Sequence, residues 1–133
     1  MLIVALSTAY AAEPLPSKVL ERTEAALDAV DATEAQRSEV HRLVQDLIPQ
    51  LQALRGEGRE LREEVHAILV TPEIDRGALE DLRVDAVDLF DRGTKLMFGH
   101  VADVAELFTP AQRQTLLDLH RKMRERFHGP DPG

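Results

Sequence analysis

The residues of this sequence that could bind a metal ion are histidines and methionines placed one helical turn apart. Met97 stands three residues before His100, and His120 stands three residues before Met123. A helix would bring each sulfur and imidazole pair to one face, and such donors suit copper, with zinc as the second metal to test. Ordinary packing is the alternative, because both methionines continue apolar stripes.

Other metal chemistry has weaker support. Glu63 and His66 have the three-residue spacing that di-iron helical bundles use, but such sites need a second pair and further glutamates from other helices. The sequence contains no cysteine, which excludes disulfides, thiolate metal sites and a cysteine nucleophile. We therefore expect no resident cofactor, with zinc or copper as the exception to test.

Catalytic motifs are missing from the sequence. It has no G-x-S-x-G, no H-E-x-x-H and no glycine-rich phosphate loop, and beyond residue 11 the only serines are Ser17 and Ser38. No nucleophile can be paired with a general base. We therefore expect a protein that is not an enzyme.

Composition points to a single helical domain. The chain has 133 residues, of which 30% are charged and only 4% aromatic, and leucine, alanine and valine are abundant. Its net charge of −8 argues against DNA or RNA as a partner, because phosphate binding needs a basic face.

The first eleven residues predict export. Residues 1–6 are apolar, and Ala9-Tyr10-Ala11 fits the small-x-small pattern that signal peptidase reads, although the usual basic start is missing. We expect a signal peptide over residues 1–11 and a periplasmic protein; a buried N-terminal segment of the fold is the alternative. Residues 12–128 then form one all-α domain, and residues 129–133 a loose tail.

Apolar periodicity predicts four helices. A short helix is expected over residues 18–30, capped by Ser17, and the last over 110–127 with a basic end. Residues 34–69 carry an apolar stripe in an unbroken 4,3 rhythm through Pro49 and Gly56, which predicts one long helix; two helices meeting near Gly56 are the alternative. Asp75 is expected to cap a third helix reaching residue 107.

The third helix carries two neighbouring apolar stripes. One contains Phe90, Met97 and Val101, and the other contains Leu82, Leu89 and Leu96. Together they cover about half of the helical circumference, which is more than one partner helix can bury. We expect the short helices and a second copy of the chain to cover the remainder.

Two copies of a helix-start motif bracket this long hairpin. In Thr33-Glu34-Ala35-Gln36 and Thr109-Pro110-Ala111-Gln112 the threonine can cap the helix, and the glutamine three residues later can reach back to the threonine N–H. Pro110 suits the first helical position, where no N–H is needed. Arginine follows in both copies. Thr33, Gln36, Thr109, Pro110 and Gln112 are therefore predicted helix caps.

The order of these features resembles the Spy/CpxP-like periplasmic proteins, whose shared repeat is the LTxxQ motif. The resemblance covers roughly residues 18–127, with Ala32 and Phe108 standing where the motif has leucine. It implies a four-helix antiparallel arrangement that forms a cradle-like homodimer through the long helices. Members of the family include ATP-independent chaperones, stress-signalling proteins that restrain a membrane sensor kinase, and proteins that bind heavy metals.

The leading hypothesis is a chaperone that holds unfolded or misfolded envelope proteins during envelope stress. Its client surface is expected on the third helix, at Leu82, Leu89, Leu96 and Phe98. The same leucines could instead form the dimer seam, and both roles can share one surface. A zinc- or copper-binding sensor that signals to a membrane sensor kinase is the second hypothesis, and a helical hairpin without a client is the third.

Overall fold

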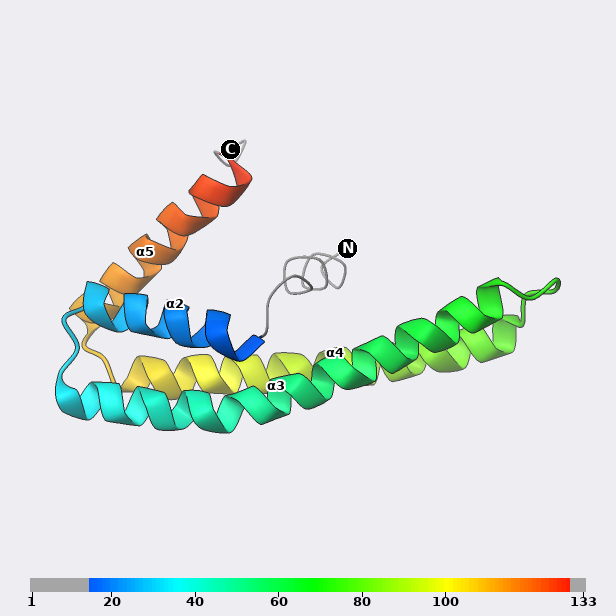
Figure 1. Ribbon diagram of the computed structural model, residues 1–133, viewed down its shortest axis with the longest axis horizontal. Coiled ribbons are helices and arrows are strands. Elements are labelled where there is room, and N and C mark those ends of the chain that lie inside the picture. Colours follow the sequence, from blue (N-terminus) through cyan, green and yellow to red (C-terminus); the bar gives the residue numbers. More distant parts are fainter. Residues whose placement is uncertain (1–14, 130–133) are drawn as a thin grey trace. The chain divides into compact units, whose positions relative to one another are not determined.

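The computed structural model describes residues 15–129 and is all-α over that range (Figure 1). It contains four helices and no strand there: α2 (Leu15–Ala29), α3 (Glu34–Leu69), α4 (Arg76–Glu106) and α5 (Pro110–His128). The predicted fold class is confirmed. The expected signal peptide and residues 130–133 of the expected tail lie outside the described residues. No helix in the described range is long and apolar enough to cross a membrane.

α3 is one helix, as the unbroken stripe predicted. It contains Pro49, which lacks an N–H for the helical ladder and costs about 3 kcal/mol inside a helix. Leu47 before it is buried and Leu51 after it is half-buried, so the apolar face continues on both sides of the proline. Burial of this face offsets the local cost and keeps the helix continuous.

The end of α2 is closed by backbone geometry that the sequence did not reveal. The N–H of Ala32 donates to Leu27 O at 3.1 Å, and the N–H of Asp31 donates to Asp28 O at 3.2 Å. Asp31 has a φ of 51°, in the left-handed region that this type of helix end requires. The start of α2 differs from the prediction: the helix begins at Leu15, so Ser17 lies in its first turn and is not the N-cap.

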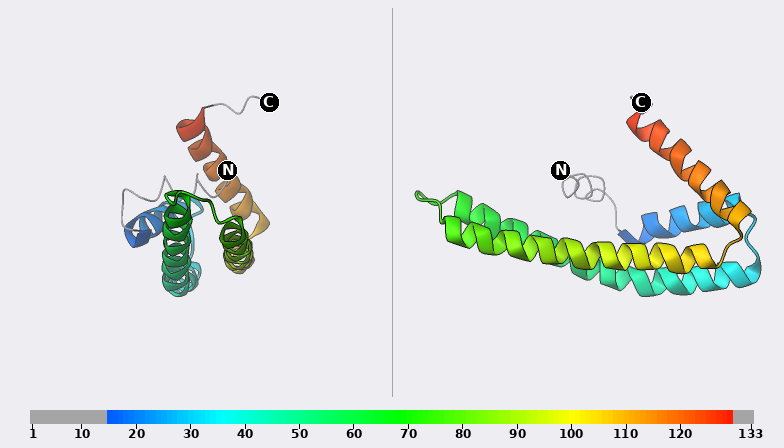
Figure 2. Two further views of the ribbon diagram at one scale, coloured as in Figure 1. Left: turned by 90° about the vertical axis from the view of Figure 1, so that its right-hand side faces the viewer. Right: turned by 180° about the vertical axis from the view of Figure 1, so that it is seen from behind.

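The chain divides into two compact units, and α3 and α4 contribute to both. The first unit comprises residues 15–45 and 103–129 of the described range, and its buried apolar side chains are Leu27, Val30, Val40, Val44 and Phe108. Figure 2 shows that the end of α2, the start of α3, the end of α4 and the start of α5 meet in this unit. We call this meeting point the helix junction.

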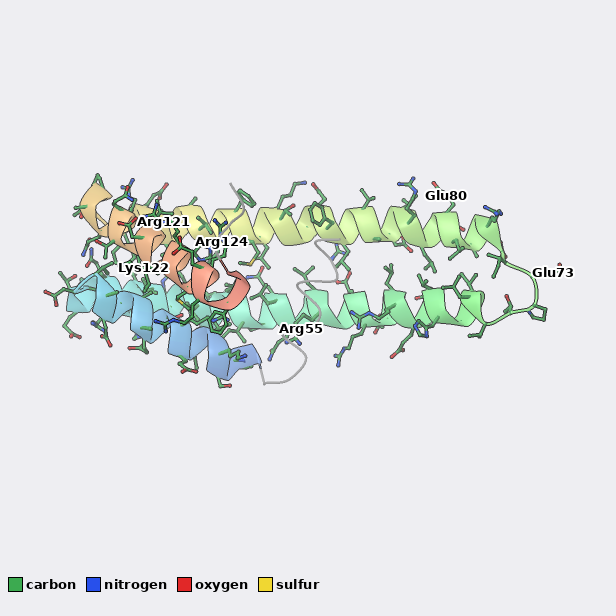
Figure 3. All side chains as sticks on the ribbon, turned by 90° about the horizontal axis from the view of Figure 1, so that it is seen from above. Arg55, Glu73, Glu80, Arg121, Lys122 and Arg124 are labelled. Carbon is green, nitrogen blue, oxygen red and sulfur yellow. The ribbon has the colours of Figure 1, made fainter. Side chains whose placement is uncertain are left out.

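The second unit, residues 46–102, is an antiparallel hairpin of α3 and α4 (Figures 1 and 3). Asp75 caps α4 at its start, where its carboxylate accepts the N–H of Ala78 at 2.9 Å. Two glycines show which sides of the helices face each other. A Cβ on Gly58 would lie 3.7 Å from Leu89 Cδ2, and a Cβ on Gly93 would lie 4.0 Å from Leu54 Cδ1. The side of α4 that carries Leu89 and Gly93 therefore packs on α3.

Candidate functional site

Both T-x-x-Q stretches form complete capping boxes at the helix junction. Thr33 Oγ1 accepts the Gln36 N–H at 3.2 Å, and Gln36 Oε1 accepts the Thr33 N–H at 3.0 Å. Thr109 and Gln112 make the same two bonds at the same distances, with Pro110 as the first residue of α5. Each box satisfies two backbone N–H groups that a helix start leaves without a partner.

The two boxes are also joined to each other, which sequence reasoning missed. Gln36 Nε2 donates to Gln112 Oε1 at 2.9 Å, and Gln112 Nε2 donates to Gln36 Oε1 at 3.2 Å. Each amide also reaches the end of another helix. Gln36 Nε2 donates to Leu107 O, just after α4, at 2.9 Å, and Gln112 Nε2 donates to Val30 O, just after α2, at 3.3 Å. We call these four bonds the glutamine bridge. It links the ends of all four helices through two side chains.

The arginine after each glutamine donates a hydrogen bond to a backbone carbonyl just before its own helix. Arg37 Nε donates to Ala32 O at 3.3 Å, and Arg113 Nε donates to Phe108 O at 3.1 Å. Arg37 also binds Asp28 of α2 at 2.8 Å, and this hydrogen bond raises the pKa of its guanidinium. His41 of α3 pairs with Glu24 of α2 beside it. The junction is therefore a polar clamp around helix ends.

A second feature is an apolar face of α4 that lies open in the second unit. Six large side chains of this helix are exposed, Phe98 by 76% and Val101 by 60%. At 3.6 residues per turn the six fall within an arc of about 140°. We call this face the α4 strip: Val84, Val87, Phe90, Met97, Phe98 and Val101.

The α4 strip faces away from α3. Figure 3 shows Glu80 on the side of α4 that is remote from α3. Phe98 follows Glu80 by eighteen residues, which is five whole helical turns, so both project to the same side. Two ion pairs lie on the same side of α4, Arg83 with Glu80 at 2.7 Å and Lys95 with Asp91 at 2.7 Å, and the helical positions of Glu80, Arg83 and Asp91 fall within the arc of the strip. The apolar side chains of the strip are therefore interspersed with paired charges of both signs.

The predicted client residues are divided between the two sides of α4. Leu82 is buried, at 7% exposure, so the expectation that it belongs to an open surface is corrected. Leu89 and Leu96 are half-buried on the side that packs on α3, and only Phe98 is fully open. No local signal distinguishes the two stripes, because both have helical spacing.

The spacing of the α4 strip also fits helix pairing. Val87, Phe90, Thr94, Met97 and Val101 follow one another at intervals of three and four residues. This is the heptad rhythm of a two-helix seam. The exposed face of α4 therefore also has the spacing of a surface that pairs with another helix.

The proposed metal donors lie in different units. Met97 is 40% exposed and His100 half-buried on α4 in the second unit, whereas His120 is exposed and Met123 half-buried on α5 in the first. Across residues 15–129, no three histidine, aspartate or glutamate side chains are gathered so that they could hold a metal ion. Each methionine and histidine pair therefore offers two protein donors.

Fold and site together define a class of protein, an all-α helical hairpin whose helix ends are joined by paired T-x-x-Q caps. The chain belongs to the heavy-metal resistance family, whose model matches residues 1–115. This is the Spy/CpxP-like helical family, so the resemblance drawn from the two motifs is confirmed. No curated protein and no solved structure is significantly similar to the chain.

Proposed function

We propose that this protein is a periplasmic, ATP-independent chaperone that holds non-native envelope proteins on the α4 strip. The observation that carries the proposal is the exposure of six large apolar side chains on one helix face. Several large apolar side chains exposed together on one side of an element often mark a binding surface. The strip includes a methionine and two phenylalanines, side chains that adapt to varied apolar partners.

The surroundings of the strip favour weak, reversible binding of clients. Paired charges of both signs lie among its apolar side chains, so no single charge pattern in a client is strongly preferred. Client binding at the strip would depend on burial of apolar surface, which requires no nucleotide. Such a surface slows aggregation in proportion to the amount of chaperone present.

The experiment is light scattering of a denatured client, diluted into buffer with and without the protein and without ATP. The wild type should suppress aggregation at near-stoichiometric ratios. V87S/F98S/V101S should require roughly tenfold more protein for the same effect, because three apolar contacts are removed. L69S/V70S/I74S is the matched control, since it removes three other exposed apolar side chains from the same unit. Equal loss in both variants, or no suppression by the wild type, would overturn the proposal.

Heavy-metal binding is the second candidate, supported by the description of the family. The residues that would bind zinc or copper are Met97 with His100 and His120 with Met123, each pair completed by donors from another molecule or from water. Titration calorimetry with zinc and with copper(I) tests it. No binding tighter than about 100 µM would rule out a sensor role, and with it signalling to a membrane sensor kinase.

A further inference from the structure

A groove of about 230 Å³ lies between α3 and α4 in the second unit. Glu57, Glu60 and Glu64 line it from α3, and Asp85, Asp88 and Arg92 from α4, with Leu61 and Leu89 between them. Pockets for small molecules enclose about 300–1,000 Å³, so this groove suits single side chains of another protein better than a metabolite.

Negative charge in the groove is only partly balanced. Arg92 donates to Glu57 at 3.1 and 2.5 Å and to Asp88 at 2.8 Å. Glu60, Glu64 and Asp85 are exposed, and among the described residues no hydrogen bond or ion pair involves them. Like charges this close repel one another, and a cationic partner would relieve that repulsion.

The opposite charge is concentrated on α5. This helix carries five basic and two acidic residues, although the chain has a net charge of −8. Figure 3 shows Arg121, Lys122 and Arg124 along it. Leu117 and Phe127 on the same helix are 63% and 73% exposed, so α5 also offers apolar side chains. The family match ends at residue 115 and does not include these residues.

We propose that α5 of one copy docks across the groove of a second copy, with basic side chains entering between α3 and α4. Charge complementarity between the two surfaces carries the assignment, and Leu61 and Leu89 offer apolar contact to Leu117 or Phe127. Each chain provides both surfaces, so each copy can give its α5 to one neighbour and receive α5 from a neighbour. The association depends on charge and weakens as salt rises. It is separate from any pairing through the α4 strip.

Two charge-reversal variants test the contact by sedimentation velocity at low salt. K122E/R126E reverses α5, and E60K/E64K reverses the groove; all four residues are exposed. Each variant alone should associate roughly tenfold more weakly than the wild type. An equimolar mixture of the two should recover wild-type association, because the reversed α5 of one meets the reversed groove of the other. Recovery on mixing requires a contact between different copies.

Matched controls have the same net charges as the two variants. R22E/R76E and E21K/E73K reverse exposed residues outside α5 and the groove, and both should associate as the wild type does. Circular dichroism checks that every variant keeps its helical content. Association that survives both reversals, or a mixture that does not recover it, would overturn the proposal. So would an α5 variant that associates normally and loses binding only to vesicles containing anionic lipid.

Discussion

Gln36 and Gln112 each hold a helix start and also reach the opposite helix start. Their carbonyl oxygens accept the N–H of their own cap residues, while their amide groups bind each other and the ends of α2 and α4. A glutamine is suited to this because one side chain carries two donors and an acceptor. Both are half-buried, so breaking the bridge leaves polar groups with fewer partners.

Replacing Gln112 by alanine should lower the free energy of unfolding by about 1–2 kcal/mol, through loss of the cap and of the bridge. Urea unfolding followed by circular dichroism measures it. Gln114→Ala is the control, because Gln114 is exposed on the same helix and bonds only to Asp118 nearby. A double-mutant cycle with Gln36→Ala should show coupling of about 0.5–1.5 kcal/mol. Purely additive losses would mean that the bridge contributes nothing.

At the residue scale, the sequence predicted hydrogen bonds between residues close together in the chain and missed those between distant residues. Each capping box spans four residues and follows from residue types and spacing alone. The bridge joins residues 76 positions apart, so nothing in the local pattern reveals it. The helix end at Asp31 was also hidden, because the left-handed position there is held by aspartate where glycine is usual.

Among the elements, α4 has two apolar sides, of which one is packed and the other exposed. The side with Leu82 and Leu89 packs on α3, and the side with Phe90 and Phe98 is open. Periodicity identified both stripes and their excess over what one partner can cover. It could not say which stripe α3 would take, because both have helical spacing.

Gly56 lies in the interior of α3 and weakens it. A Cβ added there would meet nothing within 4 Å, so Gly56→Ala should raise the free energy of unfolding by about 0.5–1 kcal/mol through helix propensity. Thermal unfolding would show a higher Tm. Gly129→Ala is the contrasting control, because Gly129 has a φ of 73° and alanine is strained there. A lower Tm for Gly56→Ala would mean that the helix needs to bend at that position.

The ion pair between Glu57 and Arg92 should make the hairpin sensitive to acid. Its hydrogen bond lowers the pKa of Glu57 below the ordinary value of 4.5. A carboxyl whose pKa is lower in the folded state stabilises the fold above its unfolded pKa, and this stabilisation is lost as pH falls through the folded pKa.

The wild type should therefore lose Tm more steeply than Glu57→Gln as pH is lowered from about 4.5. Thermal unfolding of both proteins across that range measures the difference. Because both side chains are half-exposed, 1 M salt should reduce it. Parallel pH profiles for the two proteins would show that the pair does not contribute.

At the scale of the whole molecule, one unit fixes helix ends and the other exposes an apolar helix face. The fold class and family were predictable, because caps and stripes are written into the sequence at short range. The sequence predicted an exposed apolar face on α4 but assigned it mainly to the stripe of Leu82, Leu89 and Leu96, which is buried or half-buried. Membership of the family is compatible with both client binding and metal binding. The exposed apolar side chains of α4 are the observation that favours client binding.

Site-specific photo-crosslinking from position 98 tests the chaperone account most directly. A photoreactive residue replaces Phe98, and the control carries it at Val70, an exposed apolar position of the same unit that is 81% exposed. With a denatured client in excess, position 98 should crosslink to the client and position 70 should do so far less. Crosslinks from position 98 that join two copies of the chain, and persist with excess client, would contradict the account and make the α4 strip a dimer seam.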